Sequence, residues 1–159
     1  MPVKNYKPTT PGRRHAGVLL SEVSRQQPLK KLTRGKTSKA GRNSQGRITV
    51  RHRGGGAKRL LRTIDTKRQR YDLVAKVEAI EYDPNRTANL ALLVYPDGTR
   101  SYILAPAGLK MGDRIVSSKN QVEIKTGNRL PLKHIPAGVQ VHDIELVPGQ
   151  GGVMVKSAG

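Results

Sequence analysis

Cations gathered around three consecutive glycines are the residues of this chain best suited to do chemistry. Residues 46–70 hold nine Lys and Arg and a single acid, Asp65. Glycine tolerates positive φ and lets backbone amides come close to phosphates, and guanidinium groups donate paired hydrogen bonds to phosphate oxygens. We therefore expect nucleic-acid contact here rather than a solvated linker, because so many cations would repel one another without an anion. The candidate residues are Arg47, Arg51, Arg53, Gly54, Gly55, Gly56, Lys58, Arg59, Arg62, Lys67, Arg68 and Arg70.

Residues that could act as a nucleophile, a general base or a metal ligand are scattered. The four histidines lie far apart, without the close pairing of common zinc sites, and the chain has no cysteine. Gly41 and Gly46 have the spacing of a phosphate-binding loop, but Arg47 and Ile48 stand where such a loop needs Lys and then Ser or Thr. The glycine run at 149–152 is a pattern that any loop can hold. We therefore expect no enzymatic activity, no metal, no cofactor and no small-molecule substrate.

The positive charge is concentrated in the first half of the chain. Residues 1–70 contain 20 Lys and Arg and 2 acids, a net of +18, and residues 71–159 contain 10 and 9, a net of +1, which together give +19. Nucleic acid or an anionic membrane would compensate this charge. No apolar run approaches the roughly 18 residues of a membrane span, and Gly and Pro interrupt the basic stretch, which disfavours a membrane-surface helix. Nucleic acid is the expected partner, with no membrane contact.

Strands separated by turns are expected to position these residues. Residues 71–83 alternate apolar and polar side chains, residues 88–96 and 99–104 flank the hairpin signal Asp97-Gly98, and residues 114–118 follow another glycine-containing turn. Strand fragments are also expected at 130–132, 139–146 and 153–156. This spacing favours small antiparallel β-barrels. Since roughly 40 residues cannot bury a core of their own, residues 121–159 are expected to be unstable unless RNA or a complementary fragment covers them.

The first 47 residues lack sustained apolar periodicity. Gly, Pro, Ser, Thr, Arg and Lys dominate this segment, so on its own it is expected to be disordered. One apolar patch, formed by Val18, Leu19, Leu20 and Val23, is expected to form a helical turn. An acid-poor start rich in Ser and Arg is also compatible with an organellar transit peptide.

Several long motifs resemble one family. They are KNYKPTTPGRRHA (4–16), GRNSQGRITVRHRGGGAKR (41–59), YDPNRTANLALLVYPDG (82–98) and GNRLPLKHIPAGVQVHDIELVPGQGG (127–152). On these motifs the chain resembles large-subunit ribosomal protein two, the bacterial L-two family, over nearly its whole length. Because the resemblance begins at Lys4, it argues against a transit peptide.

This resemblance implies an all-β fold. We expect a basic irregular N-terminal extension over 1–41, an OB-like barrel over 42–120 and the start of an incomplete SH3-like barrel over 121–159. The resemblance also implies a structural constituent of the large ribosomal subunit that binds large-subunit ribosomal RNA and contacts neighbouring ribosomal proteins. It implies support for subunit association and for the organisation of the peptidyl transferase region, in a cytoplasmic rather than an organellar ribosome. A nucleoid-like DNA compactor and an enzyme of RNA metabolism are the alternatives that the residues alone leave open.

The resemblance also assigns RNA contacts to particular positions. The segment RHRGGG adds His52 to the basic cluster, the DPNR turn adds Arg86, and we count Arg13 and Arg14 of the opening motif with them. Judged from its local sequence, an ordinary exposed turn is the less favoured alternative for Arg86.

The sequence departs from the family pattern in two respects. Ala57, Leu61 and Thr66 stand where His, Tyr and Phe are common in the family, which puts contacts at these positions in doubt. The sequence also ends at Gly159, inside the expected second barrel, and is therefore interpreted as C-terminally truncated relative to the family. We accordingly expect no direct contact of these residues with the peptidyl transferase centre.

Overall fold

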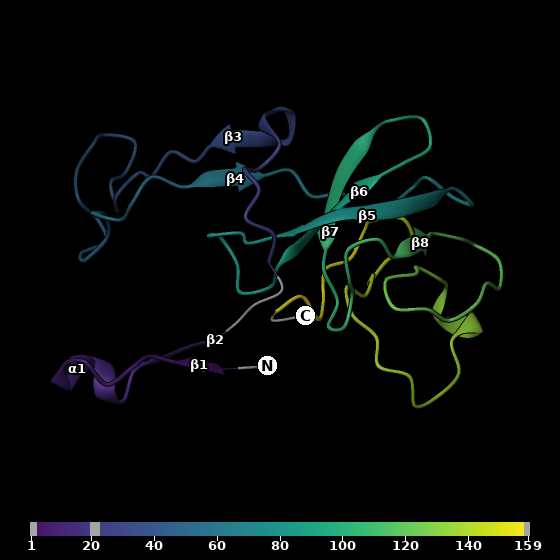
Figure 1. The fold of residues 1–159 in the computed structure, drawn as a ribbon. Helices are drawn as coiled ribbons and strands as arrows, with labels where there is room; N and C mark the ends of the chain where they lie inside the picture. The colour runs from purple at the N-terminus through teal and green to yellow at the C-terminus, as the bar shows by residue number, and fades with distance from the viewer. Residues whose placement is uncertain (1–2, 20–22, 158–159) are drawn as a thin grey trace.

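A computed structural model describes residues 3–19 and 23–157 of the chain. Two short hairpins precede a four-stranded sheet, and loops follow it (Figure 1). The elements are β1 (Val3–Asn5), α1 (Pro11–Arg14), β2 (Gly17–Leu19), η1 (Lys30–Leu32), β3 (Thr33–Gly35), β4 (Leu60–Arg62), β5 (Val74–Glu81), β6 (Leu90–Val94), β7 (Arg100–Leu104), β8 (Arg114–Val116) and η2 (Leu132–His134). The regular secondary structure of the described residues is nearly all β-strand, as expected.

The four-stranded sheet is antiparallel throughout, in the order β7-β6-β5-β8. The longest strand, β5, pairs with β6 from Lys76 to Glu81, and the register shifts between Val77 and Ala79. Such a bulge bends and twists the strand that carries it. The sheet therefore curls into a half-barrel (Figure 1), which confirms the expected OB-like fold class. The predicted strands at 71–83, 88–96, 99–104 and 114–118 are confirmed, as is the Asp97-Gly98 hairpin.

Both faces of the sheet are buried. Successive side chains of a strand point to opposite faces, so Ala91 and Leu93 of β6 join one apolar cluster, whereas Leu90 and Leu92 join the other. Tyr102 of β7 is fully buried in the second cluster. With no Phe or Trp in the chain, Val, Ile, Leu, Ala and Tyr make up both clusters.

The segment before β3 packs against the sheet instead of standing free of it. Ser24 N–H donates to the Ile80 carbonyl oxygen (2.7 Å), and Leu29 N–H donates to the Tyr102 hydroxyl (2.9 Å). Leu29 and Leu32 cover the second apolar cluster. These residues lie in the part of the chain that was expected to be disordered on its own, and the sheet gives them a surface to bury.

Two local predictions are wrong. Val18 and Leu19 were expected in a helical turn, but they pair with Lys4 and Val3 in the β1–β2 hairpin; Leu20 lies outside the described residues. The strands expected at 130–132, 139–146 and 153–156 are also not seen in the described part of 121–157. That stretch holds η2 and two isolated bridges, Ser117 with Arg129 and Ile144 with Met154. The expected segments 139–146 and 153–156 do lie side by side, but their backbone hydrogen bonds are confined to Asp143 and Ile144 on one side and residues 153–155 on the other. This pairing amounts to one isolated bridge and not to a pair of strands. The boundaries of the three expected regions stay a prediction.

No helix within 3–19 and 23–157 has the length and apolar character needed to cross a bilayer.

Candidate nucleic-acid interface

A hairpin built from β3, β4 and the residues between them carries six of the twelve candidate cations. We call residues 33–62 the basic hairpin. Its strands pair Thr33 with Arg62 and Gly35 with Leu60, and every residue from 42 to 60 is exposed. The hairpin has no Asp or Glu, and its cations are Arg34, Lys36, Lys39, Arg42, Arg47, Arg51, Arg53, Lys58, Arg59 and Arg62.

The tip of the basic hairpin, residues 41–50, is a closed loop without an apolar core. The Gly41 carbonyl oxygen accepts hydrogen bonds from the backbone N–H groups of Thr49 (3.0 Å) and Val50 (3.2 Å). The Asn43 side-chain oxygen accepts from the N–H groups of Gln45 and Arg47, both at 3.0 Å. Gly41 has φ of +72°, and a Cβ there would overlap with the Val50 carbonyl oxygen. Backbone geometry and one amide side chain therefore fix the shape of the tip.

The glycine segment lies on the return path from this tip. His52, Gly54 and Gly55 have φ of +60°, +120° and +71°, and nothing lies within 4 Å of a Cβ built on Gly55 or Gly56. Among the described residues, no backbone hydrogen bond involves residues 51–58. Amides that are exposed and unpaired next to cations can donate to phosphate oxygens, so this geometry is compatible with the predicted contact.

The 83–86 turn anchors the root of the basic hairpin. Asn85 Nδ2 donates to the Leu60 carbonyl oxygen (2.7 Å), and Asn85 Oδ1 accepts from Lys36 Nζ (3.3 Å). Arg59 also donates to the Pro84 carbonyl oxygen (3.1 Å). Two regions that are far apart in the sequence, the glycine-rich cluster and the DPNR turn, therefore belong to one structural unit.

A buried carboxylate organises this turn. Asp83 is fully buried, and its Oδ2 accepts from Arg86 Nε at 2.7 Å, while Oδ1 accepts from Asn85 N–H at 3.0 Å and lies 3.7 Å from Arg62 Nη1. Burial by itself would raise the pKa of Asp83, but the hydrogen bonds from Arg86 and Asn85 outweigh it and hold the pKa below 3.8. Asp83 is therefore ionised in the folded protein, and it orients both arginines.

A second buried carboxylate lies two residues away on β5. Glu81 accepts a hydrogen bond from the Tyr102 hydroxyl at 2.9 Å. Burial raises the pKa of Glu81 above 4.5, and the hydrogen bond from Tyr102 and the charge of Arg62 oppose this rise only in part. Burial, with a contribution from Glu81, also raises the pKa of Tyr102 to about 12. Through Tyr102 and Leu29, this pair ties the segment before the basic hairpin to the sheet.

Seven cations of the basic hairpin have no ion pair or side-chain hydrogen bond anywhere within 3–19 and 23–157. They are Arg34, Lys39, Arg42, Arg47, Arg51, Arg53 and Lys58. The sequence prediction began at Arg47 and missed Arg34, Lys36, Lys39 and Arg42. Their membership follows from the pairing of β3 with β4, which the three-residue strands do not reveal in the sequence.

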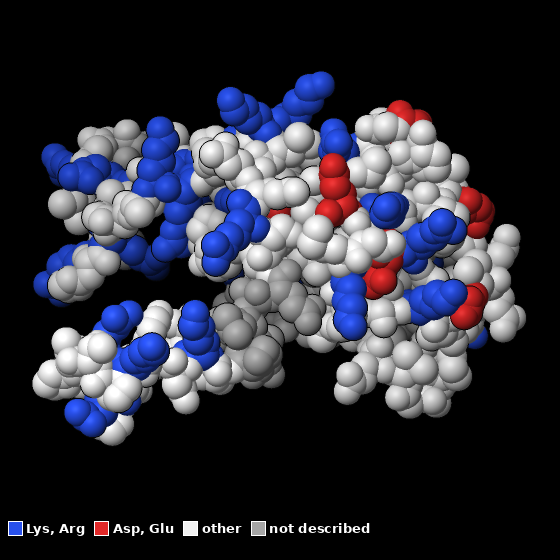
Figure 2. All heavy atoms as spheres, in the orientation of Figure 1, with Lys and Arg blue, Asp and Glu red and all other residues white. Residues whose placement is uncertain are grey.

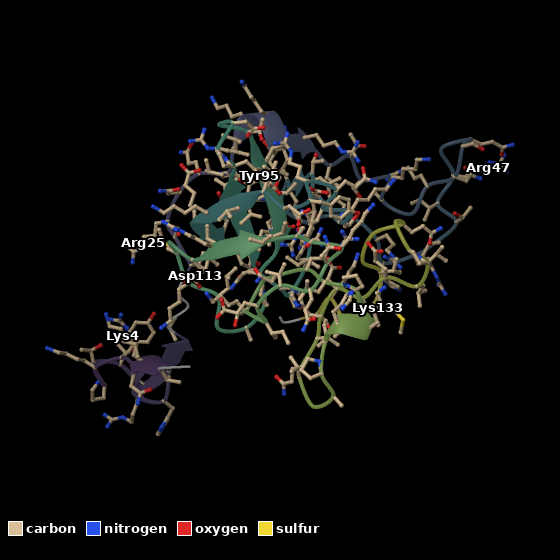
Figure 3. The ribbon with its side chains drawn as sticks, turned by 90° about the vertical axis from the view of Figure 1, so that its right-hand side faces the viewer. Lys4, Arg25, Arg47, Tyr95, Asp113 and Lys133 are labelled. Carbon is tan, nitrogen blue, oxygen red and sulfur yellow. The ribbon has the colours of Figure 1, made fainter. Side chains whose placement is uncertain are left out.

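On the face shown in Figure 2, the two projections differ from the body in charge. The two projections on the left of the view, which are the basic hairpin and the β1–β2 hairpin, show Lys and Arg side chains and no acidic atoms, whereas the body shows Asp and Glu together with Lys and Arg. Figure 3 places Arg47 at the far end of the basic hairpin and Lys4 on the β1–β2 hairpin, both far from Tyr95 on the sheet.

The comparison with known families agrees with this geometry. Residues 29–117, more than half of the chain, match the family described as "Ribosomal Proteins L2, RNA binding N-terminal domain". The chain belongs to this ribosomal protein L2 family. It is accordingly a structural, RNA-binding protein of the ribosome. The matched residues run from the segment that packs on the sheet, through the basic hairpin, to the residue that follows β8.

Several predicted site residues of this L2-family chain are held by other side chains. Arg70 pairs with Asp97 and lies 4.8 Å from the centre of the Tyr95 ring. Arg86 and Arg62 pair with Asp83, as described above. Lys67 is exposed and has no ion pair in the described part of the chain.

Arg13 and Arg14 lie outside the basic hairpin and outside the matched residues. Both end α1 in the β1–β2 hairpin, and Arg13 lies 4.8 Å from the centre of the Tyr6 ring.

Arg68 does not lie on the basic surface. It is 6% exposed, and its Nη1 donates to the Gly127 carbonyl oxygen at 2.9 Å. Charge type alone suggested an exposed residue, but the loop around Gly127 covers this guanidinium. We therefore leave Arg68 out of the proposed RNA interface.

No group of three or more His, Cys, Asp or Glu residues comes together as a metal site in the part of the chain that the structure describes.

Proposed function

We propose that the chain binds large-subunit ribosomal RNA through the basic hairpin, with the β1–β2 hairpin and the 83–86 turn as additional contacts. One observation carries this proposal: in the described part of the chain, an exposed, acid-free hairpin presents seven cations without an ion pair, and its root is fixed by Asn85 and by the buried side chain of Asp83. Folded RNA supplies phosphates on several sides, which suits cations spread over a projecting ribbon. The proposed contact residues are Arg13, Arg14, Arg47, Arg51, His52, Arg53, Gly54, Gly55, Gly56, Lys58, Arg59, Arg62, Lys67, Arg70 and Arg86, to which we add Arg34, Lys36, Lys39 and Arg42.

The chemistry of the interface is expected to be phosphate contact and shape recognition. The chain offers five Tyr and no other aromatic residue, and stacking of bases on aromatic side chains is a main mode of single-strand binding. None of these Tyr lies in the basic hairpin, so the basic hairpin binds through guanidinium groups, ammonium groups and backbone amides. Guanidinium planes can also stack on splayed bases.

We propose further that this RNA contact supports subunit association and the organisation of the peptidyl transferase region. Such a role is indirect, because the cations hold RNA in shape without supplying a reacting group. Neighbouring ribosomal proteins are proposed partners, and a cytoplasmic ribosome is the proposed location.

Competition binding tests the RNA proposal. The chain is bound to a labelled large-subunit ribosomal RNA fragment and challenged with an excess of duplex DNA. We expect the complex to persist. Equal displacement by RNA and DNA would favour a generic DNA compactor over specific RNA binding.

Matched variants locate the contact. Replacing Arg47, Arg51 and Arg53 together by Ala removes three unpaired cations and is expected to lower the slope of log K against log salt by about three, since each phosphate contact contributes about one. Arg100→Ala is the control, because Arg100 pairs with Glu78 on the sheet at 2.8 Å. An equal loss of slope in both variants would contradict the assignment to the basic hairpin.

A further inference from the structure

Tyr82 differs from the other four tyrosines of the chain in how its ring is covered. Tyr102 and Tyr95 are buried. A cation lies 4.8 Å from the centre of the Tyr6 ring and another lies 4.6 Å from the centre of the Tyr71 ring. Tyr82 is 63% exposed, and its side chain has no hydrogen bond or cation–π contact with any described residue. Its ring is therefore an aromatic face that the described fold leaves open to solvent.

This ring belongs to the root of the basic hairpin. Tyr82 follows Glu81, the last residue of β5, and precedes the buried Asp83 of the 83–86 turn. The side chains that contact this turn by a hydrogen bond or an ion pair are cationic, and they are those of Lys36, Arg59, Arg62 and Arg86. An aromatic residue and four cations therefore meet where β5, β4 and the turn come together.

An open aromatic ring beside cations matches a nucleotide better than it matches a phosphate alone. Unpaired bases of RNA stack on aromatic side chains, and such stacking accepts every base because each has a π-face. The neighbouring cations suit the phosphates on either side of a stacked base. A protein is the competing occupant, but protein-docking surfaces gather exposed apolar side chains in one patch, whereas the side chains bonded to this turn are cationic.

We propose that Tyr82 stacks on an unpaired base of large-subunit ribosomal RNA. This inference rests on the proposed RNA binding and adds base contact to an interface made of cations and backbone amides. The basic hairpin binds the RNA backbone, paired or unpaired, whereas Tyr82 needs a base that no complementary strand covers. The root of the hairpin therefore selects looped or bulged RNA over a continuous duplex.

Affinity measured over a range of salt concentrations tests this role with the full chain. The probe is a large-subunit ribosomal RNA fragment that contains loops, and a fully paired RNA of equal length is the comparison. We expect Tyr82→Ala to weaken binding of the looped RNA about ten-fold and to leave binding of the paired RNA unchanged. Stacking neutralises no phosphate, so the slope of log K against log salt should stay as in wild type. Leu146→Ala, at a side chain that is 64% exposed in the loops after β8, is the matched control and should bind as wild type does.

Three further substitutions separate the ring from its hydroxyl and its bulk. Tyr82→Phe keeps the ring and should retain the wild-type affinity. Tyr82→Leu keeps an apolar side chain without a π-face and should lose affinity as Tyr82→Ala does; it also serves if the alanine variant does not fold. Tyr82→Trp places the only tryptophan of the chain at this position, and its fluorescence should be quenched by the looped RNA but not by the paired RNA.

The outcomes separate this inference from the proposed function. Equal losses in Tyr82→Phe and Tyr82→Ala overturn the stacking proposal, because the hydroxyl would then make the contact. Wild-type affinity of both Tyr82→Ala and Tyr82→Leu also overturns it and leaves a protein as the occupant. If the triple variant of Arg47, Arg51 and Arg53 loses its salt slope while Tyr82→Ala binds as wild type does, stacking alone is rejected. If neither changes binding, both proposals fail.

Discussion

Asp83 Oδ2 lies 2.7 Å from Arg86 Nε, and the side chain of Asp83 has no exposure to solvent. This pair fixes the 83–86 turn, on which Asn85 holds the backbone of β4 through the Leu60 carbonyl oxygen. Because Asp83 also lies 3.7 Å from Arg62 Nη1, one carboxylate controls both the turn and the root of the basic hairpin. Removal of the Asp83 carboxylate should therefore lower both the stability of the fold and the affinity for RNA.

Asp83→Asn is expected to lower the free energy of unfolding by about 3 kcal/mol at pH 7, because removal of one partner leaves a largely buried charge uncompensated. Urea unfolding followed by circular dichroism measures this change. Glu123→Gln is the control, since Glu123 pairs with Lys125 where both side chains are largely exposed, and it is expected to have little effect.

The effect of Asp83→Asn should also depend on pH. The pKa of Asp83 is held below 3.8 in the folded protein, so its ionised form stabilises the fold above 3.8 and this stabilisation is lost as the pH falls through the lower, folded-state value. The difference between wild type and Asp83→Asn should therefore shrink between pH 5 and pH 2. A difference that stays constant over this range would count against the ion-pair explanation.

Glu81→Gln is expected to show the opposite dependence on pH. Burial raises the pKa of Glu81 above 4.5, so the wild-type protein loses stability as the pH rises from 4.5 through the raised value. Gln keeps an oxygen that can accept the Tyr102 hydrogen bond and does not ionise. Relative to wild type, Glu81→Gln should therefore be more stable at pH 8 than at pH 4, as measured by thermal unfolding at both values. A pH-independent difference would show that the charge on Glu81 does not destabilise the fold.

Gly41→Ala is expected to weaken binding to large-subunit ribosomal RNA without unfolding the sheet. A Cβ at Gly41 would overlap with the Val50 carbonyl oxygen and would disfavour φ of +72°. Residues 42–60 bury nothing, so the melting temperature should change little. Gly35→Ala in β3 is the matched control, because its Cβ meets nothing within 4 Å and Gly35 is not a proposed contact, and it should bind as wild type does. Filter binding of both variants decides the point, and equal affinities would mean that the shape of the tip is unimportant.

Tyr102→Phe is expected to release the segment before β3 from the sheet. The Tyr102 hydroxyl accepts from Leu29 N–H and donates to Glu81, and its loss should cost about 1–2 kcal/mol. Trypsin should then cleave faster after Lys30 and Lys31, which follow Leu29. Tyr95→Phe is the control, since the Tyr95 hydroxyl makes no hydrogen bond to a residue in the described ranges. Equal cleavage rates in the two variants would refute the role of the Tyr102 hydroxyl.

The sheet could be predicted from the sequence because its strands carry their own signals. Alternation marks β5, and the Asp97-Gly98 turn marks the hairpin of β6 and β7. Elements that depend on distant partners could not be predicted in this way. The three residues of β3 have no distinctive pattern, and they become a strand only because β4 returns beside them.

The candidate site could be predicted only in part. Residue type and spacing indicated a cationic surface, but they could not show that Arg68 is covered by the loop around Gly127 or that Arg62 and Arg86 share Asp83. In the C-terminal segment, by contrast, the sequence predicted strands that the described residues do not form. Its apolar runs resemble strands, yet their backbone pairing extends only over the bridge between Ile144 and Met154.

The closed loop at residues 41–50 has a thermodynamic consequence for association. Gly41 and Asn43 order the tip by internal hydrogen bonds before any partner arrives. Conformational entropy that folding has already removed is not lost again on complex formation. Arg42 and Arg47 should therefore contribute more to binding affinity than they would in a disordered polybasic tail of equal charge.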